Sequence, residues 1–81
     1  MKNIGPVSRG WLAEVGIYTI ADLRKAGAIT TYKILKERYP GKVSLNLLWG
    51  LEAAIRDIDW RALTKADKEE LKKKLSGGTV R

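Results

Sequence analysis

Cysteine and histidine are both absent from this chain of 81 residues. Without thiols the chain can form no disulfide, no thiolate-bound zinc or iron–sulfur site and no thioredoxin-like redox pair. Without imidazoles it has no Ser-His-Asp triad, and the missing thiols exclude cysteine nucleophiles as well. We therefore expect no bound metal and no cofactor, and a fold that is held together by its apolar core.

Long apolar segments are also missing. No run of apolar residues approaches the ~20 that span a bilayer, and the N-terminus lacks the pattern of a signal peptide. The last predicted helix is basic, but Leu71 and Leu75 are too few apolar anchors for binding a membrane surface. Because a protein without cysteine is most easily placed in a reducing compartment, we expect a cytoplasmic protein that does not associate with membranes.

Carboxylates that could act as a catalytic pair are scarce. Asp57 and Asp59 are two residues apart at a predicted helix end, a spacing that does not converge on one substrate, and no phosphate loop of the Walker type is present. A chain this short also leaves little volume for an enclosed pocket. We expect a protein that is not an enzyme.

The composition that remains is that of one small globular domain. Hydrophobic residues make up 44% of the chain and charged residues 31%, with only two prolines. We expect a domain over residues 1–75 and a flexible tail over residues 76–81, where serine, glycine and threonine predominate.

Positive charge is concentrated at the two ends of the sequence. The formal net charge is +7, made up of +5 over residues 1–43, −1 over residues 44–63 and +3 over residues 64–81. This distribution indicates a phosphate-bearing partner. Lysines that only keep a small protein soluble explain the same excess equally well.

Periodicity and helix-end signals predict an all-α fold. We expect a compact bundle of about five short helices, and the resemblance of residues 3–23 to helix-hairpin-helix (SAM-like) domains implies that architecture. The expected helices cover residues 6–15, 20–26, about 30–39, 44–57 and 65–75, with one short helical turn at 59–63. No alternation of apolar and polar residues is strong enough to indicate a strand.

Helix caps can be assigned from local patterns. Thr19 with Asp22, and Thr64 with Asp67, have the spacing of capping boxes. Thr30 or Thr31 is expected to cap the third helix, and Ser44 the fourth. Glycines 16 and 27 follow the first two helices, as C-terminal glycines do.

The fourth predicted helix is apolar on nearly all sides and should form the buried centre of the domain. Gly50 within it is expected to pack closely against a neighbouring backbone. The three tryptophans are assigned to the core, and Val7 to the inward face of the first helix. Tyr18 lies in a predicted loop and is the best candidate for an exposed aromatic side chain.

The start of the chain resembles a helix-hairpin-helix motif. The resemblance is carried by Ile4-Gly5-Pro6, Trp11-Leu12 and Gly16-Ile17-x-Thr19-x-x-Asp22-Leu23, with Asn3 in the place of the first hairpin glycine. In that motif, free backbone N–H groups at a helix N-terminus hold a DNA phosphate. The alternative is that this turn only packs two helices together. The candidate nucleic-acid-binding residues are Lys2, Asn3, Gly5, Arg9, Lys33, Lys36 and Lys42.

Nearly the whole chain is similar to the C-terminal domain of the TfoX/Sxy family. The similarity covers residues 3–75 and is most specific at Ser44-Leu45-Asn46-Leu47-Leu48-Trp49-Gly50-Leu51-Glu52-Ala53-Ala54, continuing at Trp60-Arg61-x-Leu63. It implies a bacterial role in natural transformation, where family members promote expression of competence genes together with a cyclic-AMP-responsive activator. Full members carry a further N-terminal domain, so we expect either an isolated domain or a stand-alone single-domain member.

Two hypotheses for the mechanism follow from these resemblances. In the first, the candidate basic residues contact the phosphates of duplex DNA. In the second, the domain docks on a transcription factor or another protein through exposed groups such as Tyr18. The run Lys72-Lys73-Lys74 favours neither hypothesis, because cations are favourable near the C-terminus of any helix.

Overall fold

The architecture is seen in a computed structural model, which describes residues 4–77. Within this range the chain forms short helices and no strand, which confirms the predicted all-α class. The elements are α1 (Pro6–Glu14), α2 (Ile20–Ala26), α3 (Ala28–Arg38), α4 (Leu45–Arg56), the 3-10 turn η1 (Trp60–Ala62) and α5 (Lys65–Gly77). The last helix continues two residues beyond its expected end, and positions 78–81 of the predicted tail lie outside the described residues.

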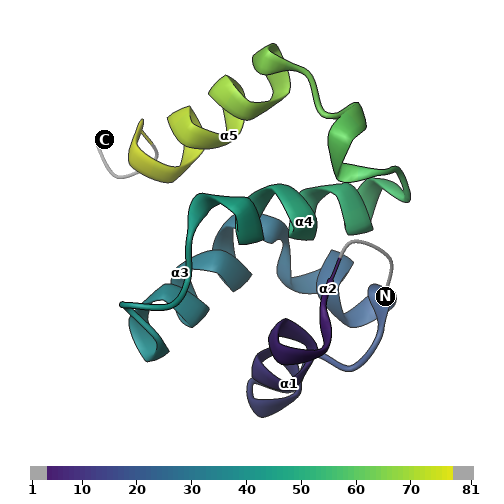
Figure 1. Cartoon of the computed structure of the whole chain (residues 1–81), viewed down its shortest axis with the longest axis vertical. Helices are drawn as coiled ribbons and strands as arrows, with labels where there is room; N and C mark the ends of the chain where they lie inside the picture. Colours follow the sequence, from purple (N-terminus) through teal and green to yellow (C-terminus); the bar gives the residue numbers. More distant parts are fainter. Residues whose placement is uncertain (1–3, 78–81) are drawn as a thin grey trace.

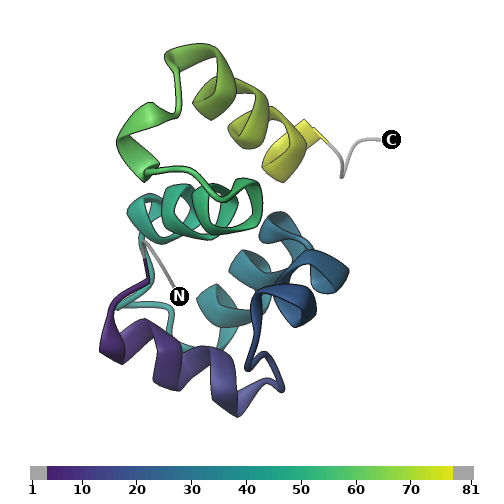
Figure 2. The same cartoon turned by 90° about the vertical axis from the view of Figure 1, so that its right-hand side faces the viewer.

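Helix α4 crosses the middle of the molecule. In two views at right angles, α5 lies on one side of it, while α1, α2 and α3 lie on the other (Figures 1 and 2). The side chains of Leu48 and Leu51 are completely buried, and Trp49, Ala53 and Ala54 are buried as well. Full burial of a leucine contributes roughly 1.5–3 kcal/mol, so α4 supplies much of the core, as its composition predicted.

The two predicted capping boxes are both present. The N–H of Asp22 donates to the Thr19 hydroxyl at 3.1 Å, and the N–H of Thr19 donates to the Asp22 carboxylate at 3.2 Å. Thr64 and Asp67 form the same reciprocal pair at the start of α5. These boxes depend on residues three positions apart, which is why sequence alone could identify them.

The predicted cap of the third helix is wrong, whereas the predicted cap of the fourth helix is correct in position but makes no side-chain hydrogen bond. Helix α3 begins at Ala28, with Gly27 as its N-cap, because Gly27 has φ +88° and turns the chain from α2 directly into α3. Thr31 is therefore inside the helix and completely buried, and Thr30 is exposed within it. Ser44 does occupy the N-cap position of α4, but its hydroxyl caps nothing, and its carbonyl accepts the N–H of Leu47.

The tryptophans differ in their burial. Trp49 is buried in the core, and Trp11 packs against the edge of the core with its ring stacked on Tyr39 at 4.9 Å. The assignment of Trp60 to the core is wrong: its side chain is 44% exposed, because η1 is a single turn whose apolar anchor is the adjacent Leu63.

Helix α1 lies on the surface, and this overturns the inward placement of Val7. Leu12 is its buried residue, and Ile4 just before the helix is the second attachment to the core. Val7 lies between these two anchors in the chain, on the solvent side of α1, and is 67% exposed. The start of α1 is consequently open to solvent.

Candidate nucleic-acid interface

The start of α1 presents backbone donors that have no acceptor among residues 4–77. Gly5 is the N-cap, Pro6 is the first helical residue, and the first helical hydrogen bond runs from the N–H of Arg9 to the carbonyl of Gly5 at 2.9 Å. The N–H groups of Val7 and Ser8 precede that bond, and the described residues give them no acceptor. Together with the helix dipole they form an anion-favouring end.

Space around this helix end is open. A side-chain carbon built at Gly5 or Gly10 would meet nothing within 4 Å, and Arg9 between them is exposed. Arg9 forms no ion pair with any carboxylate in the described part of the chain. A phosphate could therefore reach the free N–H groups and the guanidinium together. Lys2 and Asn3, which were also predicted for this site, lie outside the described residues.

The other predicted basic residues gather at a second location. Lys33 and Lys36 are exposed one turn apart on α3, and Lys42 is exposed in the turn that follows. Figure 1 shows this turn and the start of α1 well apart on the lower half of the molecule. The structure thus divides the predicted nucleic-acid-binding set into an α1 group and an α3 group.

Lys36 also has an intramolecular role that the sequence did not indicate. Its Nζ donates a hydrogen bond of 2.9 Å to the carbonyl of Val43, across the turn between α3 and α4. The acceptor is neutral, so the positive charge remains uncompensated, but the ammonium is held against the protein. Lys33 has no such contact in the described structure and is the more available cation of the two.

A cluster around Glu14 attaches the end of α1 to the end of α3. The Glu14 carboxylate accepts hydrogen bonds from the Tyr39 hydroxyl and from the Arg38 guanidinium, the latter at 3.2 Å. These two donors, Tyr39 first, lower the pKa of Glu14, and the same contact raises the pKa of Tyr39. Arg38 is therefore neutralised by a residue 24 positions away, which no local pattern could reveal.

Acidic side chains are largely engaged in such contacts. Those that form ion pairs within residues 4–77 are Glu14, Glu52, Asp59, Asp67 and Glu69. The exposed basic side chains that have no carboxylate partner there include those of Arg9, Lys33, Lys42, Lys65, Lys73 and Lys74. The excess positive charge of the sequence is thus displayed on the surface and remains available to a polyanion.

Tyr18 is exposed as predicted, with 71% of its surface accessible. Its backbone N–H donates to the Asp22 carboxylate at 3.0 Å, so the capping box of α2 also fixes the loop that carries the ring. This bond is the main reason why the pKa of Asp22 is lowered. The loop holds an aromatic side chain in the solvent on an ordered support.

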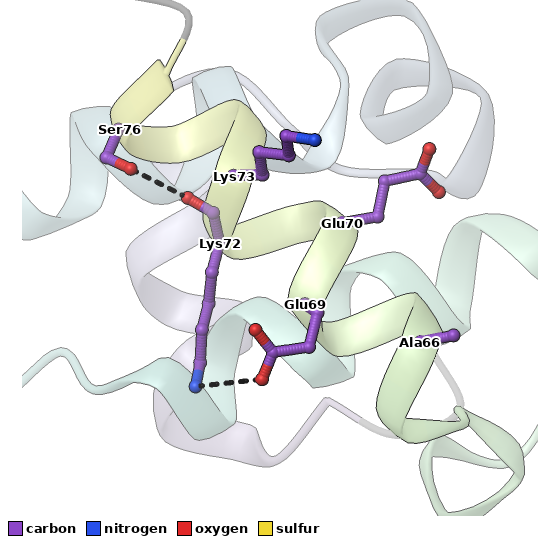
Figure 3. Close-up of a pocket in the computed structure, with 6 residues that line it drawn as sticks. All are labelled: Ala66, Glu69, Glu70, Lys72, Lys73 and Ser76. Carbon is purple, nitrogen blue, oxygen red and sulfur yellow. Dashed lines mark hydrogen bonds and ion pairs between the residues drawn. The ribbon is translucent and has the colours of Figure 1, made fainter.

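A shallow hollow on the outer side of α5 does not have the features of a binding site. Its lining comes from one helix only: Ala66, Glu69, Glu70, Lys72, Lys73 and Ser76 (Figure 3). Lys72 pairs with Glu69 at 3.9 Å, and the Ser76 hydroxyl donates to the Lys72 carbonyl at 3.2 Å. The hollow is one solvated helix face, and Lys73 on it serves below as a reference position.

No group of three potential metal-ligating His, Cys, Asp or Glu side chains occurs among residues 4–77. None of the helices in this range has both the length and the apolar character needed to cross a membrane.

Comparison with known proteins identifies the family. The family model described as the TfoX C-terminal domain matches residues 1–75. Searches among curated proteins and among solved structures gave no significant match. The match covers most of the chain, including every helix that positions the features above, and the chain therefore belongs to the TfoX C-terminal domain family.

Proposed function

We propose that this domain is a non-enzymatic regulatory module for the expression of competence genes, and that it acts by contacting phosphates of duplex DNA through the start of α1. Membership of the TfoX C-terminal domain family supports the regulatory role. At the N-terminus of α1, two N–H groups have no acceptor and Arg9 has no carboxylate partner among residues 4–77, and this supports the DNA contact most directly.

The chemistry of this helix end suits a phosphate. Backbone N–H groups at a helix N-terminus donate to phosphate oxygens without reading sequence, and a guanidinium can add two parallel hydrogen bonds. Gly5 and Gly10 leave room for a DNA strand beside the helix, whereas larger residues there would hold it away. The uncompensated lysines would attract the duplex from a distance and strengthen binding at low salt.

Docking on a transcription factor is the second candidate function. The observation that favours it is Tyr18, an aromatic ring that is 71% exposed on a loop fixed by Asp22. Aromatic side chains of this kind are common anchors of protein interfaces. A Tyr18→Ala variant that keeps DNA binding but loses competence-gene expression would identify this route.

A fluorescence-anisotropy titration of labelled duplex DNA tests the proposed contact. We compare Arg9→Glu with Lys73→Glu, which changes the charge equally on the outer face of α5. Arg9→Glu should weaken DNA binding more than Lys73→Glu does. It should also make the negative slope of log affinity against log salt shallower by about 1, as expected for the loss of one phosphate contact. Equal effects of the two variants would leave only nonspecific attraction and would overturn the assignment of α1.

The regulatory role needs a cellular measurement. The gene would be deleted in its host and replaced by the unchanged, Arg9→Glu or Lys73→Glu form. In each strain, the transformation frequency and the transcript levels of competence genes would then be measured. The proposal predicts that deletion and Arg9→Glu reduce both, while Lys73→Glu restores them. Unchanged transformation after deletion would contradict the regulatory role.

A further inference from the structure

A second surface lies between α3 and the C-terminal part of α5. It is an open groove of about 460 Å³ lined by Tyr32, Lys33, Lys36, Glu37 and Leu75. In Figure 2 the yellow end of α5 lies at the upper right, above blue and teal helix segments, and the purple start of α1 lies at the lower left. The groove joins residues more than thirty-five positions apart in the sequence, so no local motif predicted it.

The groove has an apolar floor. The Tyr32 side chain is almost fully buried, with 6% exposed, and Leu75 packs against the core while still reaching the groove surface. Lys33 and Lys36 line the groove as well, and lysine stems commonly lie along apolar surface while their ammonium groups stay in solvent or on a polar partner. One apolar side chain of a partner could cover this floor.

The edge of the groove is positively charged. Lys33 has no carboxylate partner in the described residues, and the Lys36 ammonium contacts only the neutral carbonyl of Val43. Glu37 is the one acidic lining residue.

We propose that this groove docks an acidic segment of a protein partner that carries one apolar side chain between carboxylates. The apolar floor takes that side chain, and Lys33 and Lys36 face the carboxylates. A DNA strand complements this surface less well, because its phosphates and sugars would leave the exposed part of Leu75 without an apolar neighbour. This docking site is separate from the DNA contact at α1 and does not depend on it.

The test uses a fluorescein-labelled peptide of alternating aspartate and leucine as the probe, titrated with the whole domain. Binding should be lost with a peptide in which serine replaces leucine, and with one in which lysine replaces aspartate. In ¹H–¹⁵N correlation spectra of the domain, the amides of Lys33, Lys36 and Leu75 should shift on titration with the unlabelled probe. Shifts at other positions with none in the groove would overturn the proposal.

Matched variants separate the groove from general charge. Lys33→Glu should weaken peptide binding about ten-fold or more, whereas Lys73→Glu, with the same change of charge, should change it about two-fold or less. Leu75→Ser should weaken binding of the leucine peptide; should it unfold the domain, as judged by circular dichroism, the comparison of Lys33 with Lys73 still decides. Equal losses in the two lysine variants would overturn the proposal.

Duplex DNA and the α1 variant complete the design. Peptide binding by Arg9→Glu should be no weaker than peptide binding by the reference variant Lys73→Glu. DNA binding, in contrast, should be weaker in Arg9→Glu than in Lys73→Glu. Failure of the α1 contact therefore leaves the groove result intact, and the reverse also holds. Duplex DNA that shifts the groove amides and displaces the peptide would assign the groove to nucleic acid and overturn the proposed protein partner.

Discussion

Replacing Thr31 with valine is predicted to raise the free energy of unfolding. Thr31 lies inside α3, its side chain is 0% exposed, and its hydroxyl oxygen has no hydrogen-bond partner in the described structure. A buried hydroxyl without a partner loses its hydrogen bonds to water on folding and regains none. Valine has nearly the same shape and carries a methyl group where threonine carries the hydroxyl.

The size of the effect follows from this burial. An unsatisfied buried polar group costs about 1–3 kcal/mol, and valine and threonine have similar helix propensities, so the helix itself is little affected. We expect Thr31→Val to stabilise the domain by about 1 kcal/mol, the lower end of that range because the new methyl must fit the existing packing. For a domain of this size, such a gain raises Tm by roughly 4–8 °C.

Urea and thermal unfolding followed by circular dichroism measure this change. Thr30→Val is the matched control, because Thr30 is the adjacent residue of the same helix and is exposed. The control should stay within about 0.5 kcal/mol of the unchanged protein. A loss of about 1 kcal/mol or more in Thr31→Val alone would show that the hydroxyl does form a stabilising bond, and would refute the reasoning.

Two further predictions concern the attachment of α1 and the packing of α4. Tyr39 and Arg38 lower the pKa of Glu14 below its ordinary value of 4.5 in the folded state, so this carboxylate contributes stability above that value, and the contribution is lost as pH falls through the lower, folded-state pKa. In urea unfolding at several pH values, the free energy of unfolding should therefore fall less steeply towards acid pH in Glu14→Gln than in the unchanged protein. The same pH profile in both proteins would contradict this role. Gly50 is buried in α4, so Gly50→Leu should destabilise the domain by about 1–3 kcal/mol in the same assay, and a neutral result would refute a close neighbour.

Features that depend on neighbouring residues were predicted well from the sequence. Both capping boxes, the position of Gly16 and Gly27 after the first two helices and the burial of α4 follow from patterns within a few positions. The prediction of a threonine cap for α3 failed because one glycine serves both α2 and α3. A periodic pattern cannot reveal that two helices share a single joining residue.

Exposure and long-range contacts were less accessible to prediction. Val7 satisfies the apolar spacing of α1, but Ile4 and Leu12 on either side of it are the buried residues, and Val7 itself faces solvent. The pairing of Arg38 with Glu14 and the hydrogen bond from Lys36 to Val43 arise only when the helices pack. For the candidate site, the helical pattern placed Lys33 and Lys36 on the outer side of their helix, where they are exposed, but it could not separate the α3 group from the α1 group.

The proposed contact between α1 and duplex DNA is tested most directly by ¹H–¹⁵N correlation spectra recorded during titration with a short duplex at low salt. The account predicts that the amide signals of Val7, Ser8, Arg9 and Gly10 shift together, because the first two donate to a phosphate and the others flank it, and that the shifts diminish as salt rises. Shifts confined to α5 or to the α3 group, with the start of α1 unchanged, would contradict it.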